Sequence, residues 1–176
     1  MRHLLLLRHA KSSWTDSSLA DHDRPLDAEG QADALAIRGA LLGPDPAPDL
    51  ILVSSARRTR ETLERLQPLP GASRIQITSD LYLASPRQIL DQLAELPAET
   101  ARVLVIAHNP GLHDLAMILL GAHAAALGKP GSQRLARGFP TAALAEFSLA
   151  GPWRSLPEGA ELIRFLTPHD LQTATR

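Results

Sequence analysis

A chain of 176 residues with 44% apolar content is long enough to bury the core of one domain, and we expect residues 1–176 to form a single domain. The 18 basic and 19 acidic side chains nearly balance, which argues against binding to nucleic acid or to an anionic membrane. The absence of cysteine excludes disulfide bonds, thiolate metal ligands and a cysteine nucleophile. The N-terminal apolar run is too short for a signal peptide or a membrane span, so we expect a soluble cytoplasmic protein.

Strands and helices are predicted to alternate, because unbroken apolar runs alternate with segments of helical period. In the first half, the pattern predicts a buried strand at Leu4–Leu7, a polar loop over residues 11–24, a helix with Ala34, Ile37 and Leu41 on one face, a buried strand at Leu50–Val53, a helix with Thr62, Leu63 and Leu66, and an edge strand at Arg74–Ile77. In the second half, it predicts a helix that begins at Ser85-Pro86, a strand at Arg102–Ala107, a helix with Leu112, Leu115 and Leu119 on one stripe, a loop over residues 124–140, and strands near Ala142–Leu149 and Glu161–Leu166.

This alternation is typical of an α/β fold in which right-handed strand–helix–strand units build a mostly parallel sheet. Helices then cover both faces of the sheet, which gives a three-layer α/β/α sandwich. The sequence contains no internal repeat and no boundary of a second domain.

Three junctions between a strand and the following helix carry residues that suit phosphate chemistry. They are Arg8-His9, Ser54–Arg58 and His108-Asn109. The carboxyl ends of parallel strands lie at one edge of a sheet, so we expect these junctions to meet in one crevice that helix N-termini face. Arginine forks suit phosphoryl oxygens, and histidine is a nitrogen nucleophile. Taken singly, His108 could also be a capped core histidine, and the arginines a solvated helix face.

The segments around these junctions resemble the signature of the histidine phosphatase superfamily. They read Leu7-Arg8-His9-Ala10, Ser54-Ser55-Ala56-Arg57-Arg58-Thr59-Arg60-Glu61-Thr62 and Ile106-Ala107-His108-Asn109-Pro110. Further segments resemble the SixA-type phosphohistidine phosphatase branch, namely Asp23–Gly30, Leu81–Pro86, Asn109–Leu112 and Phe139–Leu144. The resemblance spans nearly the whole chain. It implies a phosphoglycerate mutase-like catalytic domain and a phosphoric ester or phosphoramidate hydrolase that uses neither a metal nor a cofactor.

The resemblance also assigns residues to roles. It makes His9 the nucleophile that attacks phosphorus and forms a phosphohistidine enzyme intermediate. Arg8, Arg58 and His108 would hold the phosphoryl oxygens, and Asn109 belongs to the substrate-binding residues. The family arginine falls on the second arginine of the pair, because that residue stands at the motif spacing from the following Glu-Thr. The attacking nitrogen of His9 must be unprotonated, so another group must fix its tautomer, and the sequence does not reveal which.

One position departs from the family pattern. Many members carry a carboxylic acid after the third strand as proton donor to the leaving group, and Leu83 occupies that position here. Asp80 lies three residues upstream, on the opposite face of an extended segment, which leaves His108 or solvent as the donor. The chain also lacks the long insertions that build a cap over the site in larger members. An open site favours a phosphoryl group carried by a protein.

Three functions therefore stay open on the sequence. The main prediction is a phosphatase that acts on phosphohistidine in a protein, such as a phosphorelay histidine domain. The alternatives are a phosphomonoesterase that acts on small phosphate esters, and a catalytically weak module that binds phosphoproteins. The sequence names neither the physiological substrate nor the oligomeric state.

Three further features have two interpretations each. His22 lies between two aspartates, but a solvated loop explains this arrangement better than a cation site. Trp14 in the long first loop is either a recognition aromatic or a packed anchor. The basic residues Lys129, Arg134 and Arg137 either contact an acidic phosphoprotein or are solvated.

Overall fold

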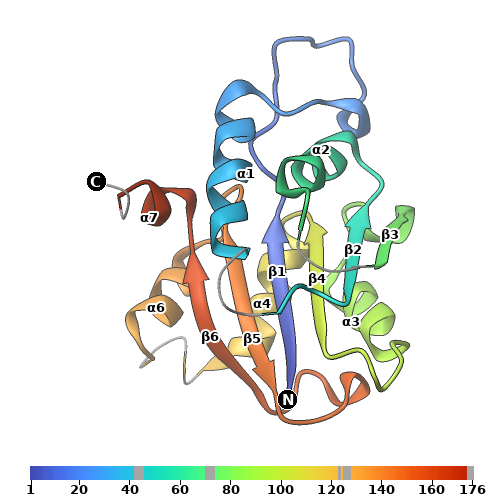
Figure 1. Ribbon diagram of the computed structural model, residues 1–176, viewed down its shortest axis with the longest axis vertical. Coiled ribbons are helices and arrows are strands. Elements are labelled where there is room, and N and C mark those ends of the chain that lie inside the picture. The colour runs from blue at the N-terminus through green and yellow to red at the C-terminus, as the bar shows by residue number, and fades with distance from the viewer. Residues whose placement is uncertain (42–45, 70–73, 123, 125–127, 174–176) are drawn as a thin grey trace.

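The computed structural model describes residues 1–41, 46–69, 74–122, 124 and 128–173. A six-stranded sheet in the order β3-β2-β4-β1-β5-β6 forms its centre (Figure 1). The strands are β1 (Arg2–Arg8), β2 (Leu50–Ser54), β3 (Arg74–Thr78), β4 (Arg102–Ala107), β5 (Leu144–Leu149) and β6 (Ala160–Leu166). The first four of these strands are parallel, whereas β5 is antiparallel to β1 and β6 is antiparallel to β5. The predicted mostly parallel sheet is confirmed.

Helices cover both faces of this sheet (Figure 1). One face carries α1 (Ala28–Leu41), α2 (Arg57–Leu66) and α7 (Pro168–Thr173), and the other carries α3 (Pro86–Ala94), α4 (Gly111–Leu120) and α6 (Pro130–Arg137). Three short 3-10 turns complete the described structure, η1 (Asp21–Asp23), η2 (Ser79–Leu81) and η3 (Trp153–Ser155). The expected three-layer α/β/α sandwich is confirmed.

The leucine run of β1 supplies both halves of the core. Leu4 and Leu6 pack into the cluster that includes α3 and α4, and Leu5 and Leu7 pack into the cluster that includes α1 and α2. All four side chains are fully buried, and burying a leucine contributes about 1.5–3 kcal/mol. Because successive side chains of a strand point to opposite faces, a strand between two helical layers needs an unbroken apolar run.

The predicted loop over residues 124–140 is wrong in part, because Pro130–Arg137 form α6. Pro130 stands in the first turn, where its missing N–H has no helical partner to lose. Leu135 is fully buried in the core cluster that contains α3 and α4. The sequence pattern missed this short helix because Gly128, Pro130, Gly131 and Gly138 give the segment the composition of a loop.

The connection between β1 and α1 projects beyond the carboxyl edge of the sheet (Figure 1). At the start of this connection, the backbone of Lys11 packs directly against Gly30 of α1. A Cβ atom at position 30 would lie 2.1 Å from the carbonyl oxygen of Lys11, so only glycine fits there. A pairing between Ser12 and Leu26 closes the base of the connection. Over this edge, the described part of the chain contains no large insertion.

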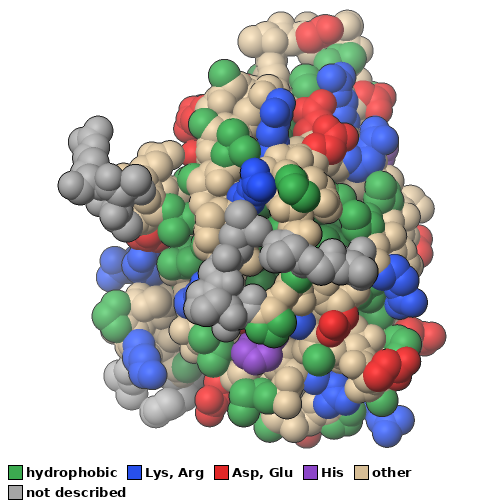
Figure 2. Space-filling model, viewed as in Figure 1, with side chains coloured by type: hydrophobic (Ala, Val, Ile, Leu, Met, Phe, Trp, Pro, Cys, Tyr) green, Lys and Arg blue, Asp and Glu red, His purple; other side chains and the backbone are tan. Residues whose placement is uncertain are grey.

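The surface carries charges of both signs. On the face shown in Figure 2, Lys and Arg side chains lie among Asp and Glu side chains. Of the helices in the described ranges, none combines the length and the apolar character needed to cross a lipid bilayer.

Candidate active site

Strand register brings the two signature histidines together. Arg8, the last residue of β1, pairs with Ala107, the last residue of β4, and the His9 N–H donates to the Ala107 carbonyl. The next residue of each strand, His9 and His108, therefore leaves the same edge of the sheet. Their ring centroids lie 5.1 Å apart, and both side chains are buried.

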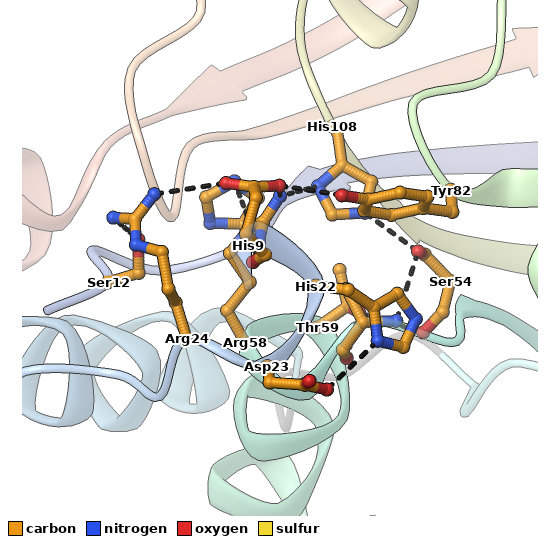
Figure 3. A network of polar contacts seen from close by, with 12 residues as sticks. His9, Ser12, His22, Asp23, Arg24, Ser54, Arg58, Thr59, Tyr82 and His108 are labelled. Atoms are coloured by element: carbon orange, nitrogen blue, oxygen red, sulfur yellow. Dashed lines mark hydrogen bonds and ion pairs between the residues drawn. The ribbon is translucent and has the colours of Figure 1, made fainter. Parts of the chain in front are cut away.

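The end of β2 supplies the third part of the site. Its last residue, Ser54, places its hydroxyl oxygen 2.7 Å from Nε2 of His108. The chain then enters α2, whose second residue is Arg58. The Arg58 side chain is only 4% exposed, and it lies between the two histidines, with Nε 3.3 Å from His9 Nε2 and Nη2 3.3 Å from His108 Nδ1 (Figure 3). The structure thus brings together His9, Arg58 and His108 as the sequence predicted.

A backbone carbonyl fixes the tautomer of His9. Its Nδ1 lies 2.8 Å from the carbonyl oxygen of Ala10, which can only accept a hydrogen bond, so Nδ1 carries the proton. In the neutral ring, Nε2 then holds a lone pair, and it accepts the hydrogen bond from Arg58 Nε. The nitrogen that faces the arginine is therefore the nucleophilic one.

Thr62 connects this carbonyl to α2. The Thr62 hydroxyl accepts a hydrogen bond of 3.0 Å from the Ala10 N–H and donates one of 2.7 Å to the Arg58 carbonyl. One side chain thus ties the backbone beside His9 to the turn of helix that presents Arg58. This gives the threonine of the motif a structural explanation.

Both histidines are held in the neutral form. Burial lowers the pKa of His9 to about 4, and the positive charges of Arg58 and Arg8 add to this effect, although the hydrogen bond with Ala10 opposes it. Burial likewise lowers the pKa of His108 to about 3, with further contributions from His9 and Arg58. Because Arg58 Nη2 can only donate, Nδ1 of His108 accepts and its Nε2–H donates to Ser54.

Asp21, on the turn η1, brings a carboxylate to the same arginine. Its Oδ2 accepts from Arg58 Nη2 at 2.9 Å, and its main-chain carbonyl accepts from Arg58 Nη1. Its other oxygen accepts from Arg24 Nη1 at 3.1 Å. Partial burial alone would raise the pKa of Asp21, but hydrogen bonds from Tyr82 and Arg58 and the charge of Arg58 lower it to about 2. The carboxylate is therefore ionised at neutral pH.

Tyr82 reaches the site from the segment that follows β3. Its hydroxyl donates to Asp21 Oδ2 at 2.7 Å, and its ring meets the ring of His108 edge-on with centroids 5.5 Å apart (Figure 3). Sequence reasoning missed both Asp21 and Tyr82 as neighbours of Arg58. Both residues lie in or beside segments that resemble the SixA-type branch, which was the available signal, but no spacing rule connects them to the second arginine.

Arg8 and Asn109 meet at a shared acceptor. Arg8 Nη1 and Asn109 Nδ2 each donate to the Phe139 carbonyl at 2.9 Å. Arg8 also lines the pocket that contains His9 and Arg58. The Asn109 side chain thus contacts the backbone that anchors Arg8.

Arg57 is turned away from the two histidines. Its side chain is exposed and forms an ion pair with Glu61 on the surface of α2, with Nε 2.7 Å from Oε1. Leu83 lies at the surface with 53% exposure and a backbone φ of 51°. Asp80 is an exposed residue of η2.

His22 forms a polar chain at the rim of the site. Its Nδ1 lies 3.3 Å from Asp23 Oδ1, and its Nε2 lies 2.9 Å from the Ser55 hydroxyl. Among the residues that the structure describes, no group of three or more His, Asp or Glu side chains is arranged to hold a metal ion.

A pocket of about 250 Å³ opens beside His9. It is lined by Arg8, His9, Lys11, Ser12, Trp14, Arg24, Arg58 and Thr141. Four of these eight side chains are arginines or lysines, so the pocket suits an anionic group such as a phosphoryl group. A nitrogen nucleophile at the wall of a cationic pocket can form a covalent bond to phosphorus.

Comparison with known proteins agrees with this geometry. Residues 4–82 match the family model described as "Histidine phosphatase superfamily (branch 1)". A protein of Mycobacterium leprae without an assigned function is 33% identical over 167 residues, which cover 92% of this chain and 99% of that protein.

Two solved structures are similar over nearly their whole length, and each is described as a proposed phosphohistidine phosphatase SixA. The structure from Nakamurella multipartitia has a TM-score of 0.82 and 31% identity, and the match covers 95% of this chain and 96% of the other. The structure from Agrobacterium tumefaciens has a TM-score of 0.78 and 30% identity, with 95% and 98% covered.

Proposed function

Because the chain belongs to the SixA-type branch of the histidine phosphatase superfamily, we propose that it removes the phosphoryl group from phosphohistidine carried by a protein. The reaction proceeds through phosphorylated His9 and uses arginine charge in place of a metal ion. The main support for His9 as the nucleophile is its neutral ring, whose lone pair on Nε2 faces the Arg58 guanidinium.

In the first step, His9 Nε2 attacks phosphorus while the bond from phosphorus to the substrate nitrogen breaks. Arg58 Nε donates to the attacking nitrogen, so this hydrogen bond must shift to a phosphoryl oxygen before His9 can attack. Arg8 donates to another oxygen. His108 can donate to a phosphoryl oxygen once its proton moves from Nε2 to Nδ1, because the Ser54 hydroxyl can then donate to Nε2. The bond from His9 Nδ1–H to the Ala10 carbonyl then stabilises the positive charge that the phosphorylated ring acquires.

In the second step, a water molecule attacks the phosphorus of phosphorylated His9. The nitrogen–phosphorus bond breaks, its electron pair returns to Nε2, and the proton of the water leaves with inorganic phosphate or its solvent shell. The enzyme regains neutral His9. Covalent catalysis of this kind divides one difficult displacement into two easier ones.

The choice of phosphohistidine rests on the missing acid. Leu83 has no proton to give, and the carboxylate beside Arg58, that of Asp21, is ionised. An alkyl phosphate leaves as a strongly basic alkoxide, whose departure general acid catalysis accelerates by about 10²–10⁴-fold. Phosphohistidine leaves as a neutral imidazole when its other ring nitrogen is protonated, so it needs no such acid. The site therefore favours phosphohistidine and aryl phosphates over alkyl phosphates.

The test compares kcat/KM for a phosphohistidine-containing protein, an aryl phosphate and an alkyl phosphate at neutral pH. We expect the first two to be hydrolysed much faster than the third, and His9→Ala to remove turnover of all three. Leu83→Glu should raise alkyl phosphate hydrolysis selectively if that position faces the leaving group. Efficient hydrolysis of alkyl phosphates by the unmodified protein would contradict the substrate argument. Tight binding of phosphoprotein without turnover would instead support a binding module.

We also propose that the protein is located in the cytoplasm. A phosphorelay histidine domain is the partner that we propose. In the described part of the chain, no large insertion covers this edge of the sheet, which supports this choice because a phosphoryl group attached to a protein needs an uncovered site.

A further inference from the structure

Trp14 is a large apolar side chain at the mouth of the pocket. It is 79% exposed, although burial of its ring would be favourable, and it lines the same pocket as His9 and Arg58. Trp14 belongs to the long connection between β1 and α1. This connection projects beyond the edge of the sheet (Figure 1). Of the two sequence interpretations of Trp14, its exposure argues against the packed anchor.

The indole ring is held in place from one side. The guanidinium carbon of Arg24 lies 3.1 Å from the centroid of the Trp14 ring, which is a stacked cation–π contact. Arg24 is itself buried, and it donates to the Ser12 hydroxyl at 2.7 Å and to the Ser13 carbonyl at 3.0 Å (Figure 3). A ring held against a fixed plane loses little further freedom when a ligand binds to it.

The reaction geometry directs the leaving group toward this ring. In an in-line displacement, the leaving group lies on the side of phosphorus opposite to the attacking His9 Nε2. His9 is buried and Trp14 is exposed, and both line the same pocket, so a leaving group directed away from His9 lies toward the exposed side of the pocket. Trp14 is the aromatic residue that lines this pocket. A flat leaving group can stack on an indole, whereas an alkyl or amino leaving group cannot.

We propose that Trp14 forms a leaving-group subsite that stacks against planar ring leaving groups, in particular the imidazole of the substrate phosphohistidine. The identity of the ring as the imidazole of phosphohistidine rests on the proposed function. The preference for planar ring leaving groups does not. Aromatic pairs of this kind contribute to binding beyond simple burial, and their loss lowers kcat/KM by about 3- to 10-fold.

The experiment compares substrates with and without a ring. Phosphohistidine and phosphoramidate both contain a phosphorus–nitrogen bond, and p-nitrophenyl phosphate and acetyl phosphate both contain a phosphorus–oxygen bond to a good leaving group. For each pair, the ratio of kcat/KM with ring to kcat/KM without ring is measured in the unmodified protein and in Trp14→Leu. We expect both ratios to fall about 3- to 10-fold in Trp14→Leu and to recover largely in Trp14→Phe. Ile163→Ala, which alters an exposed apolar residue of the edge strand β6, is the control and should change neither ratio.

Ratios that stay constant in Trp14→Leu would overturn the inference. This includes the case in which kcat/KM falls by the same factor for ring and ringless substrates, because Trp14 then only shapes the loop. Failure of the proposed function has a different signature, in which the unmodified protein hydrolyses phosphohistidine no better than alkyl phosphates. In that case, the p-nitrophenyl phosphate and acetyl phosphate pair still tests Trp14.

Discussion

Acidification should destabilise this protein, because His9 is buried in its neutral form. The shifted pKa of His9 gives the direction and the magnitude of the change in the free energy of unfolding. The folded state holds the pKa of His9 at about 4, against 6.5 for an unperturbed histidine. Between these values the unfolded chain binds more protons than the folded one, so stability falls as the pH is lowered through this window. For one such group, the free energy of unfolding should decrease by about 2 kcal/mol between about pH 7 and about pH 4.5.

This loss is measured by urea unfolding at each pH. The fluorescence of Trp153, which is buried in the core, reports the transition. Carboxylates also titrate in this range, so the relevant quantity is the difference between the unmodified protein and His9→Asn, which lacks the titrating ring. We expect the variant to lose about 2 kcal/mol less on acidification. An equal loss in both proteins would refute the assignment of a neutral, buried His9. The same neutral histidine predicts an acidic limb of kcat/KM near pH 4 and not near 6.5.

Three further predictions concern the cationic pocket and its support. Arg58→Ala should lower kcat by about 10²–10³-fold, by analogy with the loss of one oxyanion donor, whereas Arg57→Ala should have a small effect because its side chain pairs with Glu61 at the surface. Steady-state rates of the two variants decide the point, and the reverse order would contradict the proposed site. Thr62→Val leaves the buried Ala10 N–H without its acceptor, so the free energy of unfolding in urea should drop by about 1–3 kcal/mol, and a normal value would show that the bond is dispensable. Thr62→Ser retains the hydroxyl and is the matched control. Activity should survive exhaustive chelation and be inhibited by vanadate, and a loss that a divalent ion restores would contradict catalysis by arginine charge.

The fold was largely predictable because its strongest elements have unambiguous patterns. The leucines of β1 and the run in β4 have the length and the unbroken apolar character typical of strands buried on both faces. Each strand is followed at once by a signature histidine. Parallel strands then force His9 and His108 to one edge of the sheet. The position of Arg58 followed from its motif, and its burial agrees with that register.

Other parts of the site could not be predicted. The partner that sets the tautomer of His9 is the carbonyl of Ala10, and every residue carries a carbonyl, so no residue type marks it. Asp21 reaches Arg58 only because the loop after β1 folds back across the edge of the sheet, which is a tertiary effect without a local pattern. Tyr82 meets Asp21 across 61 residues of chain, which is also a tertiary contact without a local pattern.

The strand order has a consequence for how the chain folds during synthesis. Within the sheet, β1 has two neighbours, β4 and β5, and His3 pairs with Arg102 on one side and Ser148 on the other. During synthesis, β1 therefore has no partner in this sheet until the chain has been made as far as Arg102. Long-range parallel pairing is slow, and an unpaired apolar strand is prone to aggregate in the meantime. The run Leu4–Leu7 is consequently the segment that a nascent-chain chaperone has most reason to bind, and the catalytic pocket closes only after β4 inserts between β1 and β2.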